Sequence, residues 1–152
     1  NIQLAAVAGA MGMGVPAAIA AALRAPDRQV ICFVGDGGYQ MTGNEISVAV
    51  ERNLSIRIIV SNNGSLGTIR LYQEKAYPDR TLATDMANPD FAKIAEAYGA
   101  KGFKINKNED IERVIKEAFA VDGPALIEVN ASLEYLAAYI NLSQIRKAVS
   151  KK

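Results

Sequence analysis

Two short runs of branched apolar residues constrain the fold of this chain most strongly. Residues 30–34 and 56–61 are dense in Val and Ile, a composition typical of strands that are buried on both faces of a parallel sheet. Residues 102–105 and 125–129 form two weaker strand candidates, and helical patterns separate the four runs. Strands that alternate with helices predict an α/β fold. We therefore expect a three-layer α/β/α sandwich with a mostly parallel central sheet, in which 30–34 and 56–61 are inner strands.

Several residues between these strands have the spacing of helix ends. Thr42 and Glu45 match a capping box, in which each side chain binds a backbone N–H of the first turn. Asn88 precedes Pro89 and a helical pattern that stops at Gly99, so Asn88 is expected to be the N-cap of that helix. Three further segments have helical composition or periodicity: 68–75, 108–122 and the stretch after 142.

The composition excludes several kinds of chemistry. The 152 residues include no histidine and one cysteine, Cys32. This excludes Ser-His and Cys-His catalysis, His-ligated metals and multi-cysteine zinc sites within the chain. Any metal must therefore be bound by oxygen atoms, and Cys32 is expected to be a small buried apolar residue. A net charge of +1 gives no sign of nucleic-acid binding.

Residues 4–23 carry no charge and are long enough to span a bilayer. They are mostly Ala and Gly, with Pro16 among them, so a membrane span is not expected. We expect instead an apolar surface that packs against another domain or subunit. Because the chain begins at Asn1, without Met or a basic leader, we expect a single domain, residues 1–152, of a longer cytoplasmic enzyme.

The segment Gly35-Asp36-Gly37-Gly38-Tyr39 follows the first strand candidate. Glycines between a strand and a helix let backbone N–H groups approach a phosphate. The dinucleotide pattern G-x-G-x-x-G does not fit, because its third glycine position is Gln40. The carboxylate of Asp36 would repel a diphosphate unless a cation lay between them. The loop therefore indicates half of a divalent-metal site.

A second loop, Asn62-Asn63-Gly64-Ser65, follows the second strand candidate. Asn-Gly is also a strong hairpin signal, but the residues that follow have helical composition instead of strand alternation. Two parallel strands would bring both loops to the carboxyl edge of the sheet, where ligands bind in such folds. Magnesium prefers six oxygen ligands. The side chains of Asp36 and Asn63, a backbone carbonyl and two diphosphate oxygens would supply five.

The two loops together resemble a family signature. Gly35-Asp36-Gly37, a gap of 24 residues (38–61) and then Asn62-Asn63 match the signature of thiamine-diphosphate enzymes. Segments 9–18, 40–45, 88–91, 97–100, 123–129 and 142–146 extend the resemblance over nearly the whole chain. The chain resembles the C-terminal diphosphate-binding domain, or PP domain, of an acetolactate synthase-like enzyme.

The resemblance implies roles for ten residues. Asp36 and Asn63 would bind Mg²⁺ through side-chain oxygens, and Ser65 would bind it through its backbone carbonyl. The positions implied to bind thiamine diphosphate are Gly35, Gly37, Gly38, Gly67 and Thr68 around the diphosphate, with Gly9 and Met11 at the aminopyrimidine ring.

The resemblance also implies what the chain lacks. In the family, an activating glutamate comes from a separate pyrimidine-binding domain, usually of a partner subunit. We therefore expect a homo-oligomer that decarboxylates or ligates 2-oxo acids, with no catalytic residue and no activity in this chain alone. The alternatives are a benzaldehyde lyase, benzoylformate decarboxylase or oxalyl-CoA decarboxylase of the same family, a non-catalytic nucleotide-binding module and a flavodoxin-like electron carrier.

Overall fold

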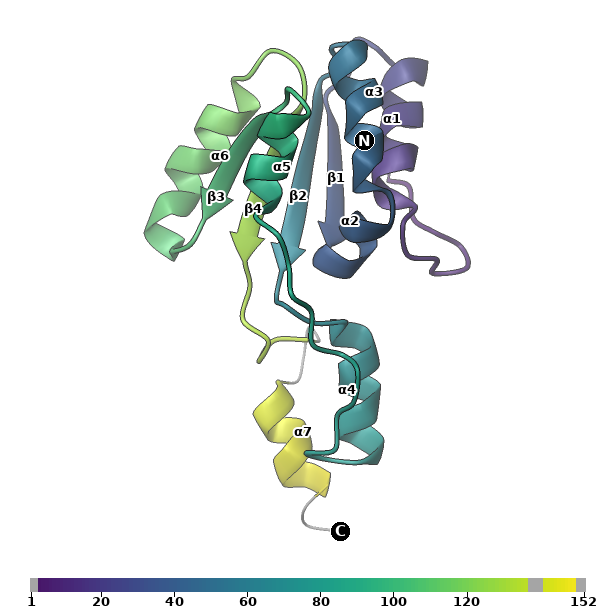
Figure 1. Ribbon diagram of the computed structural model, residues 1–152, viewed down its shortest axis with the longest axis vertical. Helices are drawn as coiled ribbons and strands as arrows, with labels where there is room; N and C mark the ends of the chain where they lie inside the picture. The colour runs from purple at the N-terminus through teal and green to yellow at the C-terminus, as the bar shows by residue number, and fades with distance from the viewer. Residues whose placement is uncertain (1–2, 137–140, 150–152) are drawn as a thin grey trace.

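The computed structural model describes residues 3–136 and 141–149 and has a four-stranded sheet at its centre (Figure 1). All strand pairs are parallel, and the strands lie in the order β1-β2-β4-β3. The four predicted strands are confirmed, and each is one residue longer than expected. They are β1 (Val30–Gly35), β2 (Ile56–Asn62), β3 (Lys101–Ile105) and β4 (Ala125–Asn130).

The prediction that β1 is an inner strand is wrong. In the described sheet β1 lies at one edge, and the inner strands are β2 and β4. Ile58 and Ile127 on the inner strands are fully buried, whereas 76% of Phe33 on β1 is exposed. A run of branched residues indicates that a strand can be buried, but it carries no information about which strand pairs on each side.

Helices cover both faces of the sheet, so the predicted three-layer α/β/α architecture is confirmed. On one face the larger apolar core includes Ile19, Ile46 and Phe91 packed on Cys32 and Ile58. On the other face α6 packs against β3 and β4 through Val114 and Ala118. The helices of the first face are α1 (Gly14–Arg24), α2 (Asp36–Thr42), α3 (Ile46–Glu51) and α5 (Phe91–Ala97), and α6 is Ile111–Phe119.

Two predicted helix caps are wrong. The hydroxyl of Thr42 donates to the carbonyl oxygen of Gly12 at 2.6 Å instead of capping a helix. The helix begins six residues earlier, because α2 starts at Asp36 directly after β1. The N-cap of α5 is Asp90, whose carboxylate accepts from the N–H of Lys93 at 3.0 Å. Short 3₁₀ helices at Gly43–Glu45 and Asn108–Asp110 precede α3 and α6.

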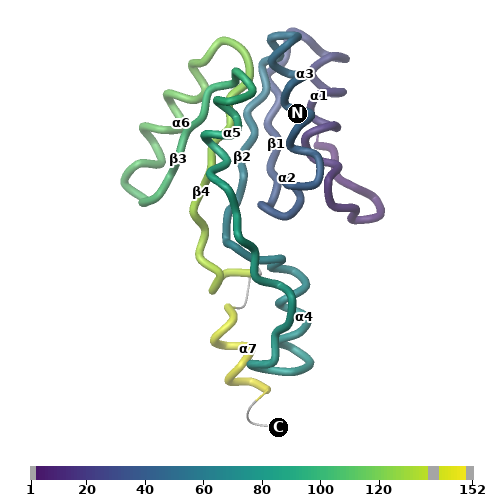
Figure 2. The backbone as a smooth tube through the Cα atoms, in the orientation of Figure 1, coloured from purple at the N-terminus to yellow at the C-terminus, as the bar shows by residue number. Residues whose placement is uncertain are grey.

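Two helices extend beyond the carboxyl edge of the sheet, and both tube and ribbon show them beside each other (Figures 1 and 2). They are α4 (Gly67–Ala76) and α7 (Leu142–Val149). The fully buried carboxylate of Glu74 on α4 accepts from Nε of Arg146 on α7 at 3.0 Å. This hydrogen bond is the main reason that the pKa of Glu74 lies below its ordinary value. None of the helices in the described ranges has the length and apolarity required to cross a membrane.

Candidate functional site

Asp36, the first residue of α2, joins the end of β1 to the loop that follows β2. The strands are in parallel register, with Gly35 opposite Ser61, so a hairpin through Asn63 and Gly64 is excluded. Oδ2 of Asp36 accepts from the N–H of Gly64 at 2.9 Å, and Oδ1 accepts from the N–H of Gly37 at 2.9 Å. Only 3% of Asp36 is exposed. The two segments thus meet at the carboxyl edge as expected, with a buried carboxylate between them, although the segment after β1 is the start of α2 and not a loop.

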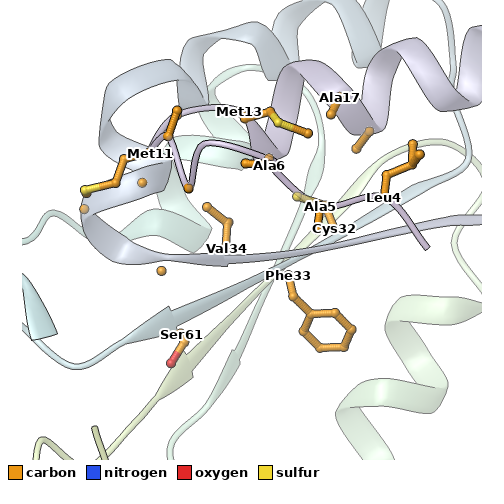
Figure 3. Close-up of a pocket in the computed structure, with 18 of the residues that line it drawn as sticks. Leu4, Ala5, Ala6, Met11, Met13, Ala17, Cys32, Phe33, Val34 and Ser61 are labelled. Carbon is orange, nitrogen blue, oxygen red and sulfur yellow. The ribbon is translucent and has the colours of Figure 1, made fainter. Parts of the chain in front are cut away.

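A cavity of about 1110 Å³ lies against this edge (Figure 3). Its walls come from the N-terminal segment, α1, β1, the start of α2 and the loop after β2. All ten residues predicted as site residues line it: Gly9, Met11, Gly35, Asp36, Gly37, Gly38, Asn63, Ser65, Gly67 and Thr68. The structure therefore brings the ten residues together, and what each of them binds stays a prediction.

The oxygen atoms around Asp36 fit a hard cation that shares its shell with a phosphate. The described residues contain no group of three or more His, Cys, Asp or Glu side chains that could hold a metal. Oδ1 of Asn63 accepts from the N–H of Ser65 at 3.0 Å, and the carbonyl oxygen of Ser65 accepts from the N–H of Gly67 at 2.8 Å. Each of these oxygens has a second lone pair. One carboxylate and two neutral oxygens suit Mg²⁺, which usually completes its shell with phosphate and water.

The glycines of the site differ in how much space surrounds them. A Cβ on Gly37 would lie 2.7 Å from Cδ2 of Leu66, and a Cβ on Gly67 would lie 3.0 Å from Nδ2 of Asn63. A Cβ on Gly35 would meet nothing within 4 Å. Gly37 and Gly67 therefore allow parts of the site to pack closely, whereas Gly35 borders the open cavity.

The expected loop of glycines is instead the first turn of α2. Gly37 and Gly38 lie in the first turn of the helix, where N–H groups have no backbone partner within the helix, and the N–H of Gly37 donates to Oδ1 of Asp36. Gly38 is partly exposed at this turn. The predicted contact with a phosphate is still possible, because N–H groups at the start of a helix can bind an anion as loop N–H groups do.

Met11 lies on the wall of the cavity, with 45% of its surface exposed. Its Cε would be 3.1 Å from a Cβ on Gly37. Figure 3 shows Met11 and Met13 on the side of β1 to which Val34 points, and Phe33 on the opposite side. Met11 is therefore available to a ligand and is not a core residue.

Cys32 also lines the cavity but is 5% exposed, and burial raises the pKa of its thiol to about 11. A thiol with this pKa stays protonated at neutral pH and is a poor nucleophile. The prediction of a small buried apolar residue is confirmed.

Asn88 is the residue of this site that the sequence analysis missed. Its Nδ2 donates to Oδ2 of Asp36 at 2.6 Å and to Oδ1 of Asn62 at 2.8 Å, and its Oδ1 accepts from Nε2 of Gln40 at 2.7 Å. Asn62 in turn donates to Oε1 of Glu128 at 2.8 Å. An Asn before Pro near a helix start is typical of an N-cap, and no local signal links it to a carboxylate 52 residues away.

The chain resembles known proteins over most of its length. Residues 1–129 match the family model "Thiamine pyrophosphate enzyme, C-terminal TPP binding domain". The chain is 40% identical to the mitochondrial acetolactate synthase catalytic subunit of Saccharomyces cerevisiae over 121 residues, which are 80% of this chain and 18% of that protein.

Bacterial relatives match to a similar extent. Identity is 41% over 122 residues to the acetolactate synthase large subunit of Lactococcus lactis, covering 80% of this chain and 21% of that protein. The chain is 39% identical over 119 residues to the putative thiamine pyrophosphate-containing protein YdaP of Bacillus subtilis, a match that covers 78% of this chain and 21% of that protein. The chain thus spans about a fifth of the length of these relatives.

Proposed function

Because the chain belongs to the family of C-terminal TPP-binding domains of thiamine pyrophosphate enzymes and is related to acetolactate synthase catalytic subunits, we propose that it binds the diphosphate of thiamine diphosphate through Mg²⁺. The observation that carries this proposal is the buried carboxylate of Asp36 between the ends of β1 and β2. It lies on a cavity whose walls also include the neutral oxygens of the loop after β2, the first turn of α2 and, further away along the chain, Arg24 and Arg28.

In this proposal Asp36, Asn63 and the carbonyl oxygen of Ser65 hold the cation. The cation neutralises Asp36 and lets a diphosphate approach the same wall, which an isolated carboxylate would repel. Ser65 stabilises the loop after β2, because its buried hydroxyl donates to the carbonyl oxygen of Thr84 at 2.9 Å.

Five further residues would hold the diphosphate. Gly35, Gly37 and Gly38 border it where β1 passes into α2, and Gly67 and Thr68 approach it from the start of α4. Gly9 and Met11 would contact the aminopyrimidine ring from the N-terminal side of the cavity. The chemistry that the cofactor supplies when bound is attack on a carbonyl carbon and acceptance of the resulting electron pair.

The acidic group that activates the cofactor would come from outside this chain. Among the described residues that line the cavity, Asp36 is the one acidic side chain, and here it is assigned to the cation. We therefore propose that a pyrimidine-binding domain, of the same enzyme or of a partner subunit in a homo-oligomer, completes the site. The chain by itself would then show no turnover.

The resemblance to acetolactate synthase subunits supports a 2-oxo acid as the substrate of the complete enzyme. Two of the relatives above are acetolactate synthase subunits, and we propose decarboxylation or ligation of a 2-oxo acid by the complete enzyme. A lyase or decarboxylase of the same family would use the same diphosphate site. The cytoplasmic location stays a prediction, since the yeast relative is mitochondrial by name.

Calorimetric titration of the complete protein with thiamine diphosphate tests the proposal. Binding is expected with Mg²⁺ and is expected to disappear when a chelator removes the metal. Binding that persists with chelator would contradict a metal-bridged diphosphate. Titration with a nucleoside diphosphate and with flavin mononucleotide tests the nucleotide-binding module and the flavodoxin-like carrier, and neither ligand is expected to bind.

A further inference from the structure

We infer that Asn88 is a positioning residue, which limits Asp36 to contact with a cation through one carboxylate oxygen and so favours Mg²⁺ over Ca²⁺. The inference rests on the proposed function, in which Asp36 holds the cation. It concerns a residue outside the cavity wall, which acts on the site through Asp36.

The orientation of the Asn88 amide follows from its partners. An ionised carboxylate can only accept hydrogen bonds, so the group that faces Asp36 must be the NH₂ of Asn88. Its two hydrogens are directed at Oδ2 of Asp36, 2.6 Å away, and at Oδ1 of Asn62, 2.8 Å away. The amide oxygen then faces Nε2 of Gln40, which donates to it at 2.7 Å. The partners of both amide hydrogens and of the amide oxygen are therefore all consistent with one orientation of the Asn88 side chain.

The two oxygens of Asp36 consequently differ in what they can still bind. Oδ2 accepts two hydrogen bonds, from the N–H of Gly64 at 2.9 Å and from Asn88. Oδ1 accepts one, from the N–H of Gly37 at 2.9 Å. Each carboxylate oxygen offers about two lone pairs. Oδ2 is therefore saturated, and the remaining acceptor position belongs to Oδ1.

A second set of hydrogen bonds holds Asn88 in place. Asn62 connects Asn88 to Glu128, which is 4% exposed. The other oxygen of Glu128 accepts from the N–H of Phe91 at 3.1 Å and lies 3.4 Å from Nζ of Lys104. Glu128 therefore anchors both Asn62 and the start of α5, three residues after Asn88, so that hydrogen bonds on both sides maintain the distance from Asn88 to Asp36.

The segment before Asn88 is also tied to the loop that would hold the cation. The N–H of Met86 donates to the carbonyl oxygen of Gly64 at 2.9 Å, and the N–H of Leu66 donates to that of Thr84 at 2.8 Å. Residues 84–88 thus run along the loop after β2 and end at the carboxylate of Asp36. This path gives Asn88 a fixed position relative to both halves of the site.

One-oxygen contact matters for the choice of metal. Mg²⁺ requires near-ideal octahedral geometry with short metal–oxygen distances, whereas Ca²⁺ accepts carboxylates through one or both oxygens at longer distances. If the hydrogen bond from Asn88 is removed, Oδ2 regains a lone pair and Asp36 can offer both oxygens. The site should then lose affinity for Mg²⁺ and become more tolerant of Ca²⁺.

Calorimetry of the complete protein tests this, with thiamine diphosphate titrated in the presence of Mg²⁺ or Ca²⁺. For Asn88→Ala we expect the affinity with Mg²⁺ to fall by about tenfold, the lower end of the range for partners of metal ligands. The ratio of the affinity with Ca²⁺ to the affinity with Mg²⁺ should rise. Asn88→Leu, which keeps more of the side-chain volume without a donor, should behave alike.

Gln40→Ala is the matched control, because it removes the hydrogen bond that the amide oxygen of Asn88 accepts from the exposed Gln40 and leaves the hydrogen bond to Asp36 in place. We expect the affinity ratio in this variant to equal that of the unmodified protein. A folded Asn88 variant with an unchanged ratio would overturn the inference. A merely structural role would weaken binding with both metals equally, and that result would overturn it too.

Two further measurements separate this inference from the proposal on which it rests. Asp36→Ala should abolish metal-dependent binding. If it does not, the proposed function fails, whereas loss in Asp36→Ala with an unchanged ratio in Asn88→Ala refutes only the inference. If both Asn88 variants unfold, isotope-edited infrared spectroscopy of the unmodified protein with bound Mg²⁺ tests the inference instead. The splitting between the two carboxylate stretching bands of Asp36 reports whether one or both oxygens bind the metal. One-oxygen coordination of Asp36 is expected, and two-oxygen coordination would overturn the inference.

Discussion

The carboxylate of Asp36 accepts a hydrogen bond from the backbone N–H of Gly64 at 2.9 Å, and this bond joins the end of β1 to the loop after β2. The two residues are 28 positions apart in the chain. Gly64 has φ of +67°, a left-handed conformation that glycine adopts without strain. The turn at Gly64 thus directs the N–H of this residue at the carboxylate of Asp36.

Replacing Asp36 by Ala should abolish Mg²⁺-dependent binding of thiamine diphosphate, because a methyl group cannot hold a cation between the protein and a diphosphate. Asp36→Asn keeps the shape of the side chain without its charge, and it should also bind poorly. Calorimetry of the complete protein measures both affinities, and circular dichroism checks the fold. If Asp36→Ala binds thiamine diphosphate with the affinity of the unmodified protein, the assignment of the metal site is contradicted.

Gly35→Ala should weaken cofactor binding without destabilising the protein. Gly35 has φ of −76° and ψ of 160°, which alanine adopts readily, and its added Cβ would meet no protein atom within 4 Å. The expected change in the free energy of unfolding is within about 0.5 kcal/mol. The methyl group would occupy cavity space proposed for the diphosphate, so the dissociation constant should rise. An unaltered dissociation constant would place the diphosphate elsewhere.

Gly102→Ala should have the opposite profile and destabilise the fold. A Cβ on Gly102 would lie 2.3 Å from the backbone carbonyl oxygen of Ala92, which cannot rotate away as a side chain can. Overpacking of this kind costs about 1–3 kcal/mol or more, because β3 and α5 must separate. Thermal or urea unfolding measures the loss, and Gly35→Ala is the comparison at an open position. Equal stability of the two variants would show that α5 does not pack on β3 as described.

The ion pair of Glu74 should make the attachment of α7 depend on pH. Hydrogen bonding from Arg146 is the first cause that lowers the pKa of Glu74. A carboxyl with a lowered pKa in the folded state adds stability that is fully present above its ordinary pKa. That stability is lost as the pH falls through the lowered value. The protection of the α7 amides against hydrogen exchange, measured relative to their intrinsic exchange rates at each pH, should therefore fall on acidification below about pH 4.3, the ordinary pKa of Glu.

Glu74→Gln should remove this pH dependence and cost about 2 kcal/mol near neutral pH, a typical value for hydrogen bonds to charged groups. Glu117→Gln is a suitable control, because Glu117 pairs with Arg113 by an exposed contact on α6. It should change little. If exchange in α7 is equally sensitive to acid in Glu74→Gln and in the unmodified protein, another group controls the attachment of α7.

The apolar N-terminal segment should be covered in the complete protein. Val7 is fully exposed in this chain and Leu4 is mostly exposed, although soluble proteins rarely leave extended apolar surface open. We expect slow hydrogen exchange of residues 4–12 in the complete protein. The loop around Leu82, which is also exposed here, should exchange fast and serves as the internal reference. Fast exchange of both segments would contradict an interface at 4–12.

Much of the fold and the site could be predicted because the signals are local. Branched runs indicated the strands, and residues directly after them had to meet at one edge of a parallel sheet. This placed Asp36 beside the loop that begins at Asn62. The cap predictions for Thr42 and Asn88 failed because a polar side chain near a helix start has several partners available. Which partner it takes depends on segments far away in the chain, here Gly12 for Thr42 and Asp36 for Asn88.

The sequence by itself determined the strands, their parallel direction and the placement of Asp36 and Asn63 at one edge of the sheet, since periodicity, glycine placement and strand ends are properties of neighbouring residues. The roles expected of Gly9, Met11, Gly67 and Thr68 came from the resemblance to the family. Only the tertiary structure decided that β4 inserts between β2 and β3, that β1 lies at the edge of the described sheet, and that Asn88 saturates one oxygen of Asp36. The physical reason is that strand order and buried hydrogen bonds are chosen by competition among surfaces distant in sequence, and each run of residues is compatible with more than one of them.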